Sequence, residues 1–173
     1  MFRFYFFVIF SDRKIKTYLM SQKNNMFIAL MDEYRRATID LKSILLSLSD
    51  EHFLILRDEN TLDSDCKSIQ TVVAHCIQSG YTYANYIQQT SNGVWLDYEE
   101  EITTPQFAVK EIEKMLLYTE NSFLENWQKT NKEIENTFIK TRWNVTYDVE
   151  QLLEHAIVHV LRHRRQIENF LKE

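Results

Sequence analysis

The sequence has few of the residues that interrupt regular structure, with two glycines and one proline among 173 residues. Proteins built from many short strands need such turn residues at regular intervals, so their scarcity argues against most all-β folds. Cysteine is also scarce, and Cys66 and Cys76 form no CxxC pair. We place both in one helix, where ten residues separate them by roughly 15 Å, too far for a disulfide. Reduced thiols and a cytoplasmic location are the expectation.

An excess of positive charge is also lacking. The net charge is −5, so no overall basic field exists to attract nucleic acid. The run RHRR, residues 162–165, is the one basic cluster. It is typical of a solvated helix face near a C-terminus, where cations complement the helix dipole. We therefore expect no nucleic-acid partner.

The amino terminus, residues 1–25, is treated separately. Its apolar run is half the roughly 20 residues that a membrane-spanning helix needs. Arg3 precedes this short stretch and no small-residue cleavage site follows, so the segment is a poor secretory signal. We interpret residues 1–25 as a leader that is either a mis-assigned start or disordered, with the true chain beginning at Met20 or Met26. No membrane partner is expected.

Four long segments with apolar residues at helical spacing follow the leader, and such spacing predicts amphipathic helices. They cover approximately residues 26–49, 66–89, 104–129 and 148–173. One antiparallel four-helix bundle, an all-α fold, would bury their apolar faces. We therefore expect a single domain over residues 26–173, with FIKTRWNVTY, residues 138–147, as a short β-rich connection.

Several helix ends carry local signals. Thr104 and Pro105 predict a capped start for the third helix. Asp148, with Gln151 three residues later, predicts a capping box at the start of the fourth. Gly93 in the sequence SNG is expected to provide the turn that ends the second helix.

Three of the five histidines, His155, His159 and His163, lie four residues apart in the fourth helix. At about 100° per residue, His163 lies within the apolar arc and His159 at its border, whereas His155 falls roughly 40° farther toward the polar side. His159 and His163 are therefore the pair directed at the bundle interior. Such a pair indicates either a metal site or two hydrogen-bonded core histidines.

A third histidine on a facing helix would favour a metal site, and His75 is the candidate. It lies at the edge of the apolar stripe of the second helix, in a row of small polar residues. This row contains Ser68, Ser79, Thr82 and Tyr86. Such groups can orient an imidazole through its second nitrogen, as metal sites usually require. The alternative is a buried histidine whose polar neighbours satisfy it.

Two motifs carry a family resemblance: HCIQSG, beginning at His75, and HVLRHRRQI, from His159 to Ile167. They resemble those of the DinB-like metal-binding four-helix bundle family, over residues 26–173 in helix order and loop placement. The resemblance implies that His75, His159 and His163 are the metal ligands. Many members have a glycine where this chain has Arg165. That position faces solvent, so the departure concerns partner contacts or access to the site rather than ligation.

Four other residues are expected near this site. Gln166 and Tyr86 are candidates for hydrogen bonds that support the ligands. His155 either supports the site, as a second-layer group or a proton shuttle at its mouth, or is a solvated rim residue. Arg164 points into the apolar arc, so we predict a salt bridge to an acidic residue on another helix.

Three neutral imidazoles leave at least one coordination position open, as in catalytic zinc sites. Imidazole also suits nickel, iron and copper. We expect a divalent metal ion, with zinc as first choice and nickel or iron as alternatives. The ExxH ligands of di-iron bundles are absent, as are HExxH, GxSxG and a glycine-rich phosphate loop.

Members of the resembled family include thiol S-transferases, which conjugate a low-molecular-weight thiol to electrophiles, and proteins suggested to be hydrolases. The resemblance implies a metal-dependent transferase or hydrolase acting on a small molecule. One alternative is a non-catalytic metal-binding or stress-associated bundle, with homodimerisation as a further expectation. Another is a helical interaction module whose histidines only pack.

Overall fold

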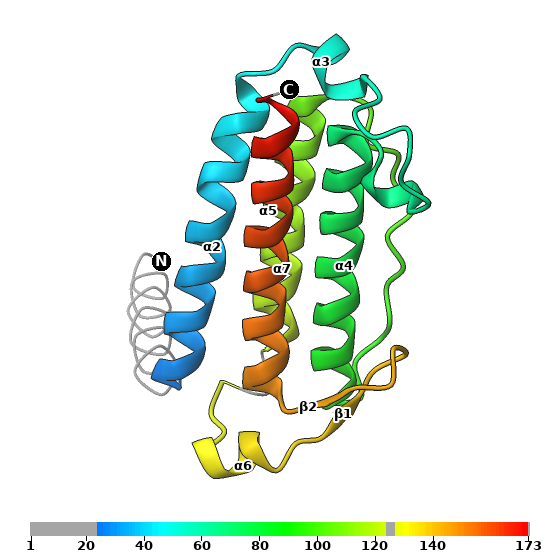
Figure 1. Ribbon diagram of the computed structural model, residues 1–173. Coiled ribbons are helices and arrows are strands. Elements are labelled where there is room, and N and C mark those ends of the chain that lie inside the picture. The colour runs from blue at the N-terminus through cyan, green and yellow to red at the C-terminus, as the bar shows by residue number, and fades with distance from the viewer. Residues whose placement is uncertain (1–23, 124–126, 173) are drawn as a thin grey trace, which may run out of the picture.

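Four long helices form the body of the protein in the computed structural model, as Figure 1 shows. The structure describes residues 24–123 and 127–172. The long helices are α2 (Asn25–Leu46), α4 (Ile69–Gln89), α5 (Pro105–Ser122) and α7 (Val149–Phe170). The predicted all-α bundle is confirmed.

The leader interpretation concerns mainly residues 1–23, which lie outside the described residues. Asn24 and Asn25, grouped with the leader on sequence grounds, belong to the fold. The Asn24 side chain accepts a hydrogen bond from the backbone N–H of Met26 and caps α2. Its own backbone N–H donates to the carbonyl of Trp127 at 2.7 Å, which ties the start of α2 to the segment after α5.

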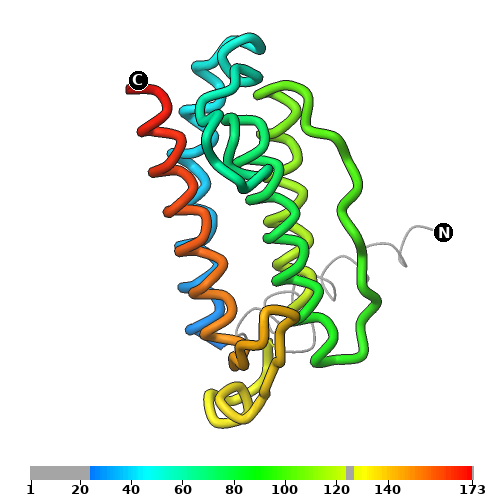
Figure 2. The backbone as a smooth tube through the Cα atoms, turned by 45° about the vertical axis from the view of Figure 1, so that its right-hand side comes forward, coloured from blue at the N-terminus to red at the C-terminus, as the bar shows by residue number. Residues whose placement is uncertain are grey.

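The four helices surround one core as a ring. Helices α4 and α2 each contact both α5 and α7, so α2 and α4 lie at opposite corners. The connection of residues 90–104 runs back along the length of the bundle, as Figure 2 shows, so α4 and α5 point the same way. Helices α2 and α7 point the opposite way. Helix α7 is therefore antiparallel to its neighbour α4.

The long connection is attached to the bundle by polar contacts that satisfy its extended backbone. Buried Asn85 on α4 donates to the carbonyl of Leu96 at 2.8 Å and accepts from its N–H at 3.0 Å. The Tyr118 hydroxyl donates to the same Asn85 side chain, and Tyr98 in the connection donates to buried Glu111. These contacts fix the connection that makes α4 and α5 parallel.

Helix α4 begins three residues later than predicted, at Ile69. Ser68 adopts an extended conformation and forms a capping box with Thr71, which sets the first helical residue. Cys66 therefore lies in the short 3-10 helix η1 (Ser64–Cys66), not in one helix with Cys76 as predicted. Both cysteines are free thiols.

The end of α4 also differs from the prediction. Asn92, with φ of 58°, adopts the left-handed conformation that was expected of Gly93. Asparagine tolerates this region because its short polar side chain can bond to nearby backbone. Gly93 meets a steric requirement instead, since a Cβ there would lie 2.0 Å from Cγ of Gln88.

Thr104 and Pro105 start α5 as predicted, but the helix ends at Ser122 rather than near residue 129. The hydroxyls of Thr119 and Ser122 donate to the carbonyls of Met115 and Thr119. Such side-chain bonds compete with continuation of the helix. A separate short helix, α6 (Asn131–Glu135), follows.

The first predicted helix is shorter too. Helix α2 ends at Leu46, and Ser49 caps a separate short helix, α3 (Asp50–Leu54). At the opposite end of the bundle, the predicted β-rich connection contains strands β1 (Ile139–Lys140) and β2 (Thr146–Tyr147), paired antiparallel. The predicted capping box of Asp148 and Gln151 then starts α7.

No helix in the described part of the chain is long and apolar enough to cross a membrane.

The core is continuous between the four helices. Gly80 permits close packing of α4 on α5, because a Cβ there would lie 2.1 Å from Sδ of Met115. Beside the start of α2, Phe27 packs against Phe123 and Trp127, with ring centroids 4.8 and 6.2 Å away.

Two adjacent leucines on α5 test this packing. Leu116 is 4% exposed and Leu117 is 59% exposed. Leu116→Ala should lower the free energy of unfolding by about 2–5 kcal/mol, because it removes buried methyl groups and leaves a cavity. Leu117→Ala, the matched control, should change it by less than about 0.5 kcal/mol. Chemical denaturation of both variants measures the difference, and equal losses would contradict the assigned face of α5.

Candidate metal centre

The structure brings together the three histidines that sequence analysis singled out as ligands. His75 comes from α4, and His159 and His163 come from successive turns of the neighbouring α7. The ring centroids lie 5.0 Å apart for His75 and His159, 5.1 Å for His75 and His163, and 4.5 Å for His159 and His163. One ligand atom from each residue lies within 4.8 Å of the other two. Such a cluster is compatible with binding of one metal ion.

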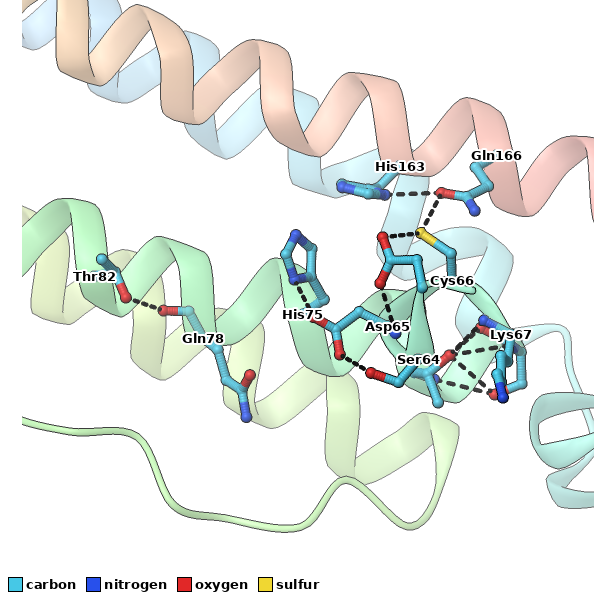
Figure 3. A network of polar contacts seen from close by, with 12 residues as sticks. Ser64, Asp65, Cys66, Lys67, His75, Gln78, Thr82, His163 and Gln166 are labelled. Carbon is cyan, nitrogen blue, oxygen red and sulfur yellow. Dashed lines mark hydrogen bonds and ion pairs between the residues drawn. The ribbon is translucent and has the colours of Figure 1, made fainter. Parts of the chain in front are cut away.

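His75 is oriented by a carboxylate outside the cluster. Its Nδ1 lies 3.0 Å from Oδ2 of Asp65, a residue of η1, and Figure 3 shows this contact beside the start of α4. An ionised carboxylate only accepts hydrogen bonds, so Nδ1 carries the proton. The lone pair of His75 is then on Nε2. A carboxylate on the second nitrogen is a frequent partner of histidine ligands in metal sites.

His163 is oriented in a similar way by a residue on its own helix. Its Nδ1 lies 2.9 Å from Oε1 of Gln166, the contact expected for that glutamine. The Sγ of Cys66 lies 3.9 Å from the same oxygen, so η1 also approaches α7 here (Figure 3). The His163 side chain is buried, with 3% exposure. Because Gln166 occupies Nδ1, the Nε2 atom of His163 is the nitrogen that can bind a metal ion.

The Nε2 atom of His159 is buried and has no hydrogen-bond partner among the described residues. A buried nitrogen without a partner costs free energy unless another group satisfies it. Burial, with smaller contributions from the positively charged forms of His163, His75, His155 and Arg162, lowers the pKa of His159 to about 3. His159 is thus neutral and presents an unused lone pair, which fits a metal ligand.

The pKa of His163 is also lowered, mainly by burial, although its bond to Gln166 opposes this shift. Neutral imidazoles are the form that binds metal. The donor set, with two rings held by outside partners and one buried nitrogen unsatisfied, therefore fits a divalent ion. The ligand assignment itself stays a prediction.

A pocket of about 290 Å³ opens beside the cluster and reaches toward the hairpin end of the bundle. Its walls come from α4, α7 and the loop between β1 and β2. Its lining residues are His75, Ser79, Thr82, Tyr83, Arg142, Trp143, His155, His159 and Arg162. Buried His163 is not in the lining, so access to the cluster from this pocket is past His75 and His159.

His155 lies in the pocket wall rather than in the three-residue ligand cluster. Its Nδ1 is 3.4 Å from the Tyr147 hydroxyl, and its ring stacks on Trp143 with centroids 6.2 Å apart. Burial lowers its pKa, so His155 is neutral near pH 7. It therefore combines an aromatic setting with a nitrogen that can accept a proton.

The polar residues in the row on α4 were expected to orient the imidazole of His75. In the structure they have several different roles. Ser68 caps the helix, while Ser79 and Thr82 line the pocket. The Tyr86 hydroxyl accepts a hydrogen bond at 2.8 Å from the backbone N–H of Arg142 in the hairpin loop. Among its described partners there is no imidazole, so the expected support of a ligand by Tyr86 is replaced by support of the loop.

Sequence reasoning missed Asp65 and the hairpin residues Arg142 and Trp143. Asp65 has no helical phase relation to His75, because η1 and the capping box intervene. The available signal was the acidic loop RDENTLDSD immediately before the histidine helix. The hairpin gave no signal for its position, since its approach to α4 depends on tertiary contacts.

The predicted salt bridge of Arg164 is present. Its guanidinium lies 2.6 Å from Asp40 on α2 and 3.3 Å from Glu168 on its own helix. Arg165, at the position where many members of the resembled family have glycine, is exposed and pairs with Glu168. The Arg164–Asp40 pair fastens α7 to α2 on the side of α7 away from α4, and leaves the histidine row facing α4.

Comparison with known proteins gives one family result. The model of the DinB family matches residues 20–173 of this chain. The matched range contains all four long helices and the three clustered histidines. No curated protein matches the chain significantly.

The low pKa of His159 predicts an acid-sensitive fold in the metal-free protein. Between pH 6.5 and about 3, His159 is neutral when folded and protonated when unfolded. The unfolded state therefore binds more protons, and the free energy of unfolding falls as pH falls, by up to about 1.4 kcal/mol per pH unit from this residue. Denaturation of His159→Gln between pH 7 and 5 should show a shallower fall than the wild type.

The exposed histidine of α3 supplies the control, since His52→Gln removes a histidine outside the cluster. This variant should keep the wild-type slope. An identical slope in His159→Gln and the wild type would show that burial does not hold His159 neutral.

Proposed function

The chain belongs to the DinB family, and from this premise we propose that it is a metal-dependent enzyme whose divalent ion, with zinc as first choice, is held by His75, His159 and His163. The reaction we propose is transfer of a small thiol to an electrophile. The observation that carries the proposal is the buried Nε2 of His159, which has no partner among the described residues and belongs to a cluster of three imidazoles.

The surroundings favour a catalytic ion over a purely structural one. Structural zinc sites are closed by four protein ligands, whereas catalytic sites have three and an open position. Three ligand candidates occur here, and a pocket of about 290 Å³ adjoins two of them. When bound, a divalent ion would supply Lewis acidity, which lowers the pKa of a thiol or water molecule that it binds.

The protein's own residues prepare this chemistry. Asp65 and Gln166 fix the rings of His75 and His163, so that each ring keeps its lone pair on Nε2. Neutral His155, hydrogen-bonded to Tyr147, is placed in the pocket wall to accept the proton that a thiol loses. Trp143 and Tyr83 supply aromatic walls that limit water around the reacting groups.

The residues that line the pocket favour thiol transfer over hydrolysis. Among the described residues, no carboxylate lines the pocket, so a carboxylate base for water is lacking there. A free thiol has a pKa near 8.5, far below the roughly 15.7 of water, and it ionises with less assistance. A neutral histidine is a sufficient proton acceptor for that step.

Metal content tests the ligand assignment. Untagged protein from metal-supplemented medium should contain about one equivalent of a divalent metal, and His75→Ala, His159→Ala or His163→Ala should reduce it to background. Helical content by circular dichroism should change little, because the apolar core shared by the four helices contains none of these three histidines. Elemental analysis of each variant provides the measurement.

Two further variants serve as controls for the measurement of metal content. His52→Ala, on exposed α3, should retain full metal content. Asp65→Asn should weaken affinity by about tenfold or more without abolishing binding, since it acts through the ring of His75. A wild type without metal, or a His52→Ala variant that loses as much as His159→Ala, would refute the assignment.

Catalysis is tested by thiol consumption. Metal-loaded protein should accelerate loss of free thiol in the presence of a model electrophile, and protein stripped with a chelator should not. His155→Gln should slow the reaction by about 10²-fold or more while leaving metal content unchanged, because it removes the proton acceptor and no ligand. If full metal occupancy gives no acceleration across a broad thiol panel, the protein is a non-catalytic metal-binding bundle.

A further inference from the structure

The pocket beside the histidines is positively charged, although the whole chain is acidic. Its lining contains two arginines, Arg142 and Arg162, and no carboxylate among the described residues, whereas the net charge of the protein is −5. The acidic residues that approach the histidines, Asp63 and Asp65, belong to the segment of η1 and are not in the lining. The charge in the pocket is therefore not neutralised by its own walls.

Arg162 carries one of these charges and lies on α7, three residues after His159. Neither its guanidinium nor that of Arg142 has a hydrogen-bond or ion-pair partner in the described part of the chain. By contrast, the neighbouring arginines on α7, Arg164 and Arg165, are both paired with acidic residues.

Arg142 lines the same pocket from a different segment, the loop between β1 and β2. The loop is fixed, since the backbone N–H of Arg142 donates to Tyr86, and Thr141 accepts and donates hydrogen bonds with Val145 across the loop. Trp143 beside it packs edge-on against Tyr83 and stacks on His155. The loop backbone and the Trp143 ring are thus held in place beside the pocket, and the exposed side chain of Arg142 contributes to its lining.

We propose that the pocket binds a small thiol that carries a carboxylate, with Arg142 and Arg162 recognising the carboxylate and Trp143 covering the molecule. This inference rests on the proposed function for the position of the thiol, which would lie at the histidine cluster. The carboxylate assignment rests on the two unpaired guanidiniums, whose planar donors match a carboxylate. A pocket of about 290 Å³ suits a small organic molecule rather than a segment of polymer.

Two isosteric probes separate charge from shape: 3-mercaptopropionate and its amide, 3-mercaptopropionamide. Both have the same thiol and chain length, and they differ in charge at pH 7. In metal-free full-length protein, titration followed by the indole N–H resonance of Trp143 should show at least about tenfold tighter binding of the acid than of the amide. Comparison with Trp143→Phe assigns the resonance.

The double variant Arg142→Gln/Arg162→Gln should lose this preference and bind acid and amide alike. Arg165→Gln is the matched control, because it removes the same charge from α7 outside the pocket, and it should keep the wild-type preference. A double variant that still prefers the acid overturns the inference. An equal loss of preference in Arg165→Gln also overturns it, since a general effect of net charge would then account for binding.

A second readout keeps this inference separate from the proposed function. Protein loaded with cobalt(II) should change its visible absorption when either thiol binds, because a sulfur ligand reaches the ion. No change with either probe would contradict the metal-centred function. A preference for the acid in the metal-free titration would then still support carboxylate binding by the two arginines.

Discussion

The contact between α4 and α7 determines the rest of the site, because it brings three imidazoles together at the edge of the bundle core, with His163 buried and His75 and His159 partly buried. Each ring has two nitrogens, and a buried nitrogen without a partner destabilises the fold. Asp65 and Gln166 satisfy the outward nitrogens of His75 and His163. The inward nitrogen of His159 is left over. A cation shared by the three rings would resolve this deficit, so the metal proposal follows from an unsatisfied interaction rather than from the presence of histidine alone.

The chain topology is what places this contact beside a pocket. The long connection of residues 90–104 sets α5 parallel to α4 and leaves one side of α4 to α7. The capping box at Ser68 then ends η1 and positions Asp65 behind His75. At the other end of α7, the hairpin closes over His155 through Trp143. Ligand, orienting group and pocket wall thus come from four separate segments.

Sequence periodicity was sufficient for the elements that have strong local signals. The start of α5 at Thr104 and Pro105, the capping box of α7 and the inward direction of His159 and His163 all follow from local chemistry or helical phase. The exact ends of the helices were predicted less well. Helix α5 ends at Ser122, whose hydroxyl bonds to the carbonyl of Thr119, and Asn92 adopts the left-handed conformation in the turn expected of Gly93.

The partners of the histidines were predictable to different extents. Gln166 could be found because it lies one turn from His163 on the same helix, whereas Asp65 could not, because it approaches His75 through an irregular loop. Tyr86 was correctly associated with this side of α4, but its hydroxyl supports Arg142. Periodicity identifies the face of a helix, and it does not identify the loop that lies against that face.

Under the proposed function, the hairpin loop at residues 141–145 would contribute to recognition while the histidines carry the chemistry. Its two short strands carry none of the candidate ligands. The hydroxyl of Tyr86 on α4 holds the loop to the bundle, and Thr141 and Val145 are hydrogen-bonded across it. If the proposed function is right, substitutions at its tip would change which molecules bind while the imidazoles stay in place. A scaffold arranged in this way can acquire new substrates during evolution by drift in a handful of loop positions, with its reactive centre inherited intact.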